Sequence, residues 1–138
     1  MSNSVLISSE SRYPINRRRI RKTVLDYLAK IGLEDAEVSV AIVGSRKIRE
    51  LNRRWRKLDE PTTVLTFGLE EPRGADGVLR IGDIIISYPE ARVIAQEDNL
   101  VMDEAIDKLL LHGLNNLLEN KDDSKFLSQI SSTKISGS

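Results

Sequence analysis

Apolar residues recur at intervals of three and four in two long segments of the chain, the spacing that puts side chains on one face of an α-helix. In the first segment this apolar face comprises Ile20, Val24, Leu28 and Ile31. Gly32 follows it, at a position where a helix favours a left-handed C-terminal cap. In the second segment, which is predicted to begin near Asn99, the apolar face comprises Ile106, Leu110, Leu114 and Leu117. The sequence therefore predicts two amphipathic helices.

A shorter helix is predicted after Gly44, with the hydroxyl of Ser45 as its N-cap. The spacing of three and four residues assigns its buried side to Ile48, Leu51 and Trp55. The remaining faces are basic and are predicted to be exposed, with Arg46, Arg49, Arg53 and Arg54. A fourth helix is predicted over residues 89–97, because the proline at its start loses no intrahelical hydrogen bond in the first turn.

Four segments predict β-strands. Residues 37–43 alternate with a period of two, which places Val38, Val40 and Ile42 on one face. Residues 5–8 form a short apolar run, and residues 62–67 and 80–88 are rich in β-branched and aromatic side chains. The predicted order is strand, helix, strand, helix, strand, strand, helix, helix. This order predicts an α+β fold, with a mixed four-stranded sheet and helices packed against it.

Length and composition indicate one domain, since 138 residues with 40% apolar content suffice for a single core. We expect this domain to span residues 1–123 and residues 124–138, rich in Ser, to form a weakly ordered C-terminal tail. The sequence has no apolar run of the roughly 18 to 20 residues that cross a membrane, and residues 1–10 do not resemble a secretory signal. Cysteine is absent, which excludes disulfides and thiolate metal sites and suits a cytoplasmic protein.

The formal net charge of zero hides an asymmetry between the two halves of the chain. Residues 1–57 hold 14 Lys and Arg against 6 Asp and Glu, whereas residues 58–138 hold 7 against 15. Thirteen of the 21 basic residues lie in residues 12–22 and 46–57. Such clustering attracts polyanions even in a neutral protein. The alternative is that these are solvated helix faces, paired internally with the acidic half.

Three stretches together resemble the YbeY family of ribosomal RNA maturation endoribonucleases. They are LNRRWRKLDEPTTVLTF at residues 51–67, IGDI at residues 81–84 and LHG at residues 111–113. They match a pattern of an aromatic residue followed by Arg, an Asp two residues before Pro-Thr, a Gly-Asp strand and a His-Gly helix. The resemblance covers roughly residues 38–118. It implies a mixed sheet surrounded by helices, in agreement with the order of elements above.

The resemblance also implies a zinc site, because the family helix ends in His-Gly-x-x-His-x-x-Gly-x-Asp-His. Three imidazoles there bind the ion and leave its fourth position to water. In this chain His112 keeps the first imidazole, whereas Asn116 and Asp122 stand at the other two ligand positions. An amide oxygen is a weak ligand for zinc, although a carboxylate is able to coordinate it. Glu119 replaces the glycine, so we consider a helix that continues past this residue.

The resemblance places Arg56 beside the cleft, where a guanidinium would hold a phosphate in two places. It therefore implies catalytic roles for Arg56 and His112. The expected RNA-binding residues are Arg46, Arg49, Arg53, Arg54 and Arg56. The expected partners are ribosomal RNA and the small ribosomal subunit, with neither DNA nor a membrane. Trp55 is interpreted as a core residue rather than as a platform for a base.

Three functions remain open on the sequence alone. The first is a metal-dependent endoribonuclease for single-stranded RNA in ribosome biogenesis. The second is a metal-free protein that binds RNA or the ribosome without cleaving it, which accounts for the missing imidazoles more directly. A metallopeptidase is a third and weaker reading, because such enzymes have a catalytic Glu directly after the first His, where this chain has Gly113.

Overall fold

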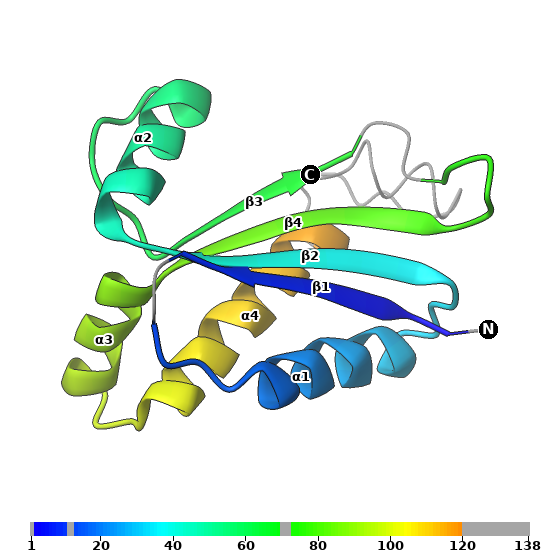
Figure 1. Ribbon diagram of the computed structural model, residues 1–138, viewed down its shortest axis with the longest axis horizontal. Coiled ribbons are helices and arrows are strands. Elements are labelled where there is room, and N and C mark those ends of the chain that lie inside the picture. Colours follow the sequence, from blue (N-terminus) through cyan, green and yellow to red (C-terminus); the bar gives the residue numbers. More distant parts are fainter. Residues whose placement is uncertain (1, 11–12, 70–72, 120–138) are drawn as a thin grey trace.

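The computed structural model describes residues 2–10, 13–69 and 73–119, which form four strands and four helices (Figure 1). Their order along the chain is β1 (Ser4–Ser9), α1 (Arg17–Lys30), β2 (Ala36–Val43), α2 (Ser45–Arg56), β3 (Val64–Gly68), β4 (Leu79–Ser87), α3 (Tyr88–Glu97) and α4 (Met102–Leu118). None of these helices combines the length and the apolar character needed to cross a membrane. The predicted tail, residues 124–138, lies outside the described residues.

The strands form one mixed sheet in the order β1-β2-β4-β3. The pairs β1–β2 and β2–β4 are parallel, and β3 runs antiparallel to β4 at the edge of the sheet. The predicted α+β fold, the mixed four-stranded sheet and the order of the eight elements are confirmed.

Helices cover the two faces of the sheet unequally. Helices α1, α3 and α4 lie on one face, and α2 alone lies on the other (Figure 1). The larger core joins Val38, Val40 and Ile42 of β2 to the predicted apolar faces of α1 and α4. The smaller core, around Ile48 and Leu65, holds α2 against the opposite face. Because α2 buries so little apolar surface, most of its circumference faces solvent.

A β-bulge shapes the pairing of β4 with β2. The register steps from Glu37 opposite Arg80 to Val38 opposite Gly82, which leaves one extra residue in β4. Gly82 has a φ of +145°, and a Cβ atom built on it would lie 2.3 Å from the carbonyl oxygen of Phe67 in β3. Only glycine allows this conformation and this close approach of two strands.

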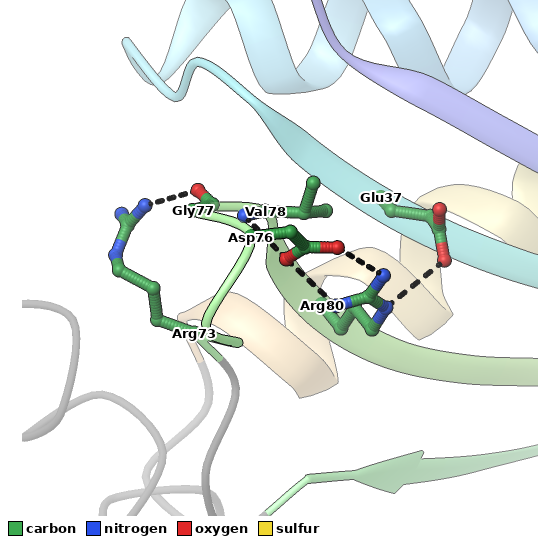
Figure 2. A network of polar contacts seen from close by, with 6 residues as sticks. All are labelled: Glu37, Arg73, Asp76, Gly77, Val78 and Arg80. Carbon is green, nitrogen blue, oxygen red and sulfur yellow. Dashed lines mark hydrogen bonds and ion pairs between the residues drawn. The ribbon is translucent and has the colours of Figure 1, made fainter.

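Polar contacts around Arg80 hold together the turn at residues 73–78 that leads into β4 (Figure 2). This guanidinium lies 3.0 Å from Asp76 and 3.7 Å from Glu37 on the neighbouring strand. Asp76 also accepts a 3.0 Å hydrogen bond from the backbone N–H of Val78. The hydrogen bond with Arg80 and that backbone bond lower the pKa of Asp76. The network fixes the turn that brings the chain into β4.

Several helix ends differ from the sequence prediction. The N-cap of α2 is Gly44, without a side-chain hydrogen bond, and Ser45 is already helical. Helix α4 begins at Met102 rather than near Asn99, because Asn99 has a left-handed φ of +55° and belongs to the turn. Ile31 is the C-cap of α1 and is exposed, whereas Gly32 has the predicted left-handed conformation. Propensity and periodicity locate helices well but their ends poorly.

The interpretation of Trp55 as a core residue is wrong. Its side chain is 61% exposed, whereas Asn52, three positions earlier in the helix, is only 3% exposed. The buried stripe of α2 thus runs through Ile48 and Asn52 at a spacing of four. Asn52 is buried because its side-chain Nδ2 donates a 3.0 Å hydrogen bond to the carbonyl oxygen of Glu60. The helix is rotated accordingly, and the indole is turned outwards.

Candidate functional site

An open cleft of about 620 Å³ runs along β3, between the C-terminal part of α2 and the last turns of α4. Helix α2 and the loop after it contribute Asn52, Trp55 and Arg56, among others, and α4 contributes Asn116. The cleft thus gathers residues from three elements that are distant in sequence. Among the hollows described for this chain it is the one that joins a basic helix to the segment carrying His112.

The C-terminal end of α2 is fixed by the buried amide of Asn52. The backbone N–H of Leu58 donates a 3.3 Å hydrogen bond to the carbonyl oxygen of Asn52, while the side-chain amide binds Glu60. Lys57, the residue before Leu58, is the C-cap of the helix and has a left-handed φ of +62°. The sequence patterns above do not identify Asn52. The feature that could have indicated its burial is its spacing of four residues from Ile48. This amide defines one wall of the cleft.

Arg56 lies against the outer edge of β3. Its Nη2 donates a 2.8 Å hydrogen bond to the carbonyl oxygen of Thr66, and its guanidinium lies 5.7 Å from the centre of the Phe67 ring. The bond between Ser87 N–H and the carbonyl oxygen of Thr63 sets the alternation of the antiparallel pair, so the Thr66 carbonyl points away from β4. A guanidinium has five N–H donors, so donors remain for an anion in the cleft.

The five predicted RNA-binding arginines are all exposed on α2. Among the ion pairs between described residues, Arg49 with Asp59 is the one that involves this helix. The basic residues of α1 are paired more extensively: Arg19 with Asp107 of α4 at 2.8 Å, and Lys22 with Asp26 at 2.7 Å. Internal pairing with the acidic half therefore accounts for Arg19 of the first basic segment, whereas Lys22 pairs within its own helix. The second basic segment keeps most of its positive charge for solvent or a ligand.

His112 and Asn116 lie one turn apart on α4, as their spacing requires. Asn116 is half-buried and lines the cleft that contains Arg56. His112 is exposed and is not part of the described cleft lining. The structure thus brings Asn116 together with Arg56 and leaves His112 on the solvent side of the helix. Asp122 lies outside the described residues.

Gly113 explains why α4 lies so close to the sheet. A Cβ atom at this position would be 2.8 Å from Cγ2 of Ile84 and 3.3 Å from Cγ2 of Thr66. The absence of a side chain therefore permits the helix to approach β3 and β4. This contact sets the distance between Asn116 and the β3 side of the cleft.

Helix α4 ends at Leu118, before the residue that replaces the glycine. Glu119 is its C-cap, with a carboxylate that accepts a hydrogen bond from the hydroxyl of Tyr27 on α1. Partial burial, together with this hydrogen bond, raises the pKa of Tyr27. The residue that replaces the glycine of the family pattern thus anchors the helix end to α1.

The described donors do not fit a zinc ion. Over residues 2–10, 13–69 and 73–119, no three His, Cys, Asp or Glu side chains are grouped as a metal site would need. The two described positions of the motif supply one imidazole and one amide, whereas catalytic zinc sites use three protein ligands drawn from imidazole, carboxylate and thiolate.

Comparison with known proteins agrees with this fold. The family described as Endoribonuclease YbeY matches residues 6–125 of the chain. A relative named Endoribonuclease YbeY from Anaeromyxobacter sp. (strain Fw109-5) is 42% identical over 118 residues, which cover 83% of this chain and 59% of that protein. Another of the same name from Sulfurihydrogenibium sp. (strain YO3AOP1) is 34% identical over 131 residues, 91% of this chain and 86% of that protein.

The chain spans 59% and 51% of the lengths of the two Anaeromyxobacter relatives that it matches. Among solved structures, the solution structure of TM1509 from Thermotoga maritima superposes with a TM-score of 0.57 at 23% identity, over 93% of this chain and 89% of that one. That likeness concerns the fold. The match over most of the sequence and the identity with the bacterial relatives lead to one conclusion: the chain belongs to the Endoribonuclease YbeY family.

Proposed function

We propose that the chain is an endoribonuclease that acts on single-stranded RNA in the cytoplasm, in the processing of ribosomal RNA bound to the small ribosomal subunit. The observation that carries this proposal is the position of Arg56, held by Thr66 and Phe67 in a cleft beside an exposed basic helix. The names of the relatives support an RNA substrate. Ribosomal RNA as the target follows from the resemblance of the three sequence stretches to the family.

In this proposal the residues of α2 divide the work on the substrate. The arginines at positions 46, 49, 53 and 54 bind the RNA backbone, since guanidinium groups match phosphate oxygens in geometry and charge. Arg56 binds the phosphate at the site of cleavage and stabilises the negative charge that develops there. Asn116 faces the same cleft from α4 and orients a polar group of the RNA through its amide.

The test is cleavage of a fluorescently labelled single-stranded RNA by the purified full chain. We expect the wild-type protein to cleave it and Arg56→Ala to lose at least about 100-fold in rate, the cost typical of removing one donor to a charged transition state. Reactions with added zinc and with a chelator show whether a metal contributes. Equal cleavage by both proteins, or none above background under any condition, would reject the proposal.

A second function is favoured by one specific observation, the unsuitability of the imidazole of His112 and the amide of Asn116 as a zinc site. We propose as the alternative a metal-free protein that binds RNA or the ribosome without turnover. It predicts RNA binding that weakens steeply with salt, because phosphate contacts release counterions. Elemental analysis after purification in zinc separates the two: about one equivalent of zinc favours the metal-dependent enzyme, and none favours the binding protein.

A further inference from the structure

Trp55 is an exposed aromatic residue at the rim of the cleft. Its side chain is 61% exposed, although tryptophan is the largest of the side chains that normally contribute to cores. Leu58, also part of the cleft, is 50% exposed. An isolated exposed apolar residue is ordinary, but two of them in the lining of one cleft form a surface suited to a ligand with a flat apolar face.

The indole of Trp55 is held in place from one side. Its ring lies edge-on to the ring of Phe67, with centroids 6.3 Å apart and an angle of 68° between the planes. The same Phe67 ring is covered by the guanidinium of Arg56 at 5.7 Å. Phe67 itself belongs to β3 and packs on the smaller core. The indole is therefore oriented before any ligand arrives, which lowers the entropic cost of binding.

The charges around Trp55 indicate what kind of ligand fits. Arg53, Arg54 and Arg56 are its neighbours in sequence and are all exposed. An apolar protein surface would be a poor match for an exposed indole on a helix end that carries three exposed arginines. A single-stranded nucleic acid is a good match, because it combines negative phosphates with flat bases that stack on aromatic side chains. In a duplex the bases are already stacked on one another and their faces are not available.

We propose that Trp55 is a stacking platform for one unpaired nucleobase of the bound RNA, next to the phosphate held by Arg56. The inference rests on the proposed function, because it takes RNA as the ligand of the cleft. It goes further by assigning the preference for single strands to a named side chain. Since stacking depends on a π-face that every base has, the platform selects unpaired nucleotides rather than a particular sequence.

The chain has one tryptophan beside three tyrosines, so its tryptophan emission, excited selectively, reports on Trp55 alone. We would titrate the full chain with three RNAs of equal charge: a single-stranded oligonucleotide, the same oligonucleotide without its bases, and a duplex. Anisotropy of labelled versions measures binding independently of the indole. We expect the single strand to quench the tryptophan emission and the other two to bind with little quenching.

Two variants complete the experiment. Trp55→Leu keeps an apolar side chain but has no aromatic face, and we expect it to bind the single strand about 5- to 150-fold more weakly. Trp55→Phe keeps a ring and should recover most of the affinity. Because Trp55 makes no phosphate contact in this proposal, the salt dependence should be equal in all three proteins. Circular dichroism spectra check that both variants are folded.

The possible results separate the stacking inference from the proposed function. Binding of the single strand without quenching, equal quenching by the base-free oligonucleotide, or unchanged affinity of Trp55→Leu would overturn the inference alone. Quenching and weakened binding of Trp55→Leu without any RNA cleavage would support the inference and contradict the endoribonuclease. A protein that binds none of the three RNAs would overturn both, and a change of emission with protein concentration alone would point to a second copy of the chain instead.

Discussion

Nε of Arg49 lies 2.8 Å from Oδ1 of Asp59, which joins the middle of α2 to the loop that leads into β3. The hydrogen bond and the charge of this arginine lower the pKa of Asp59. Among the described ion pairs this is the one that α2 makes. The pair holds the loop near α2 and neutralises one arginine of this helix.

The first prediction concerns the pH dependence of this pair. Because the folded-state pKa of Asp59 is lowered, the pair stabilises the protein above the unfolded pKa, and this contribution is lost as the pH falls through the folded pKa. Asp59→Asn should therefore lower the melting temperature slightly at pH 7, and by less at a pH well below the ordinary carboxyl pKa of 3.8. Thermal unfolding at low salt measures the difference. An equal loss at both pH values would mean that the carboxylate charge is not its cause, and 1 M salt should shrink the effect because both side chains are more than half exposed.

The second prediction concerns Arg53 and Arg54 of α2, which form no ion pair with another described residue. The double variant Arg53→Gln/Arg54→Gln should weaken binding of single-stranded RNA and reduce the slope of log K against log salt by roughly 0.7 for each lost phosphate contact. The control, Arg18→Gln/Lys30→Gln, removes the same charge from α1 on the opposite side of the sheet (Figure 1). It should leave the slope nearly unchanged. Equal slopes for the two double variants would show that only net charge matters.

The third prediction concerns the bulge in β4. Gly82→Ala should lower the free energy of unfolding by about 2–5 kcal/mol, because it adds a Cβ atom 2.3 Å from the Phe67 carbonyl at a φ of +145°. Gly77→Ala is the matched control, since Gly77 has a φ of +83° but open space around it. It should cost only about 1–2 kcal/mol. Urea unfolding measures both, and similar losses would argue that backbone conformation alone accounts for the effect.

The fourth prediction concerns the weakened metal motif. Asn116→His would place a second imidazole one turn after His112, and the affinity for Zn²⁺ should rise by about tenfold or more. Isothermal titration calorimetry on the folded chain measures the change. The variant His112→Ala/Asn116→His contains a single imidazole and should bind no better than the wild type. A gain in that control would place the metal away from this helical turn.

The fold followed from the sequence because the hydrophobic pattern is strong where cores are large. The stripes of α1 and α4 cover a wide sheet face, and their buried members Val24, Leu28, Leu110 and Leu114 follow the predicted spacing. The buried face of helix α2 is harder to predict, since only Ile48 and Asn52 are deeply buried in this helix. A polar residue becomes buried when a distant carbonyl offers a partner, here that of Glu60. Periodicity cannot show such a partner, so Trp55 was assigned to the wrong side.

The site was predictable in part for the same reason. Local spacing placed His112 and Asn116 one turn apart, and the likeness of residues 51–67 to the family pointed to Arg56. Which of these residues share a cleft depends on how α4 lies against β3, and Gly113 decides that through a contact with Ile84 that is remote in sequence. The structure gathers Arg56 and Asn116 there, while the catalytic roles of Arg56 and His112 stay predictions.

The hydrogen bond from Arg56 to Thr66 also bears on how the molecule avoids self-association. Strand β3 is an outer strand, and an uncovered row of carbonyl and N–H groups is a template on which another chain can add a strand. The guanidinium of Arg56 donates a hydrogen bond to one of these carbonyl oxygens and puts a positive charge at the edge of the sheet. If two molecules approached each other through β3, the Arg56 guanidinium of one would repel that of the other. The side chain proposed to hold RNA thus also discourages aggregation through the strand on which it rests.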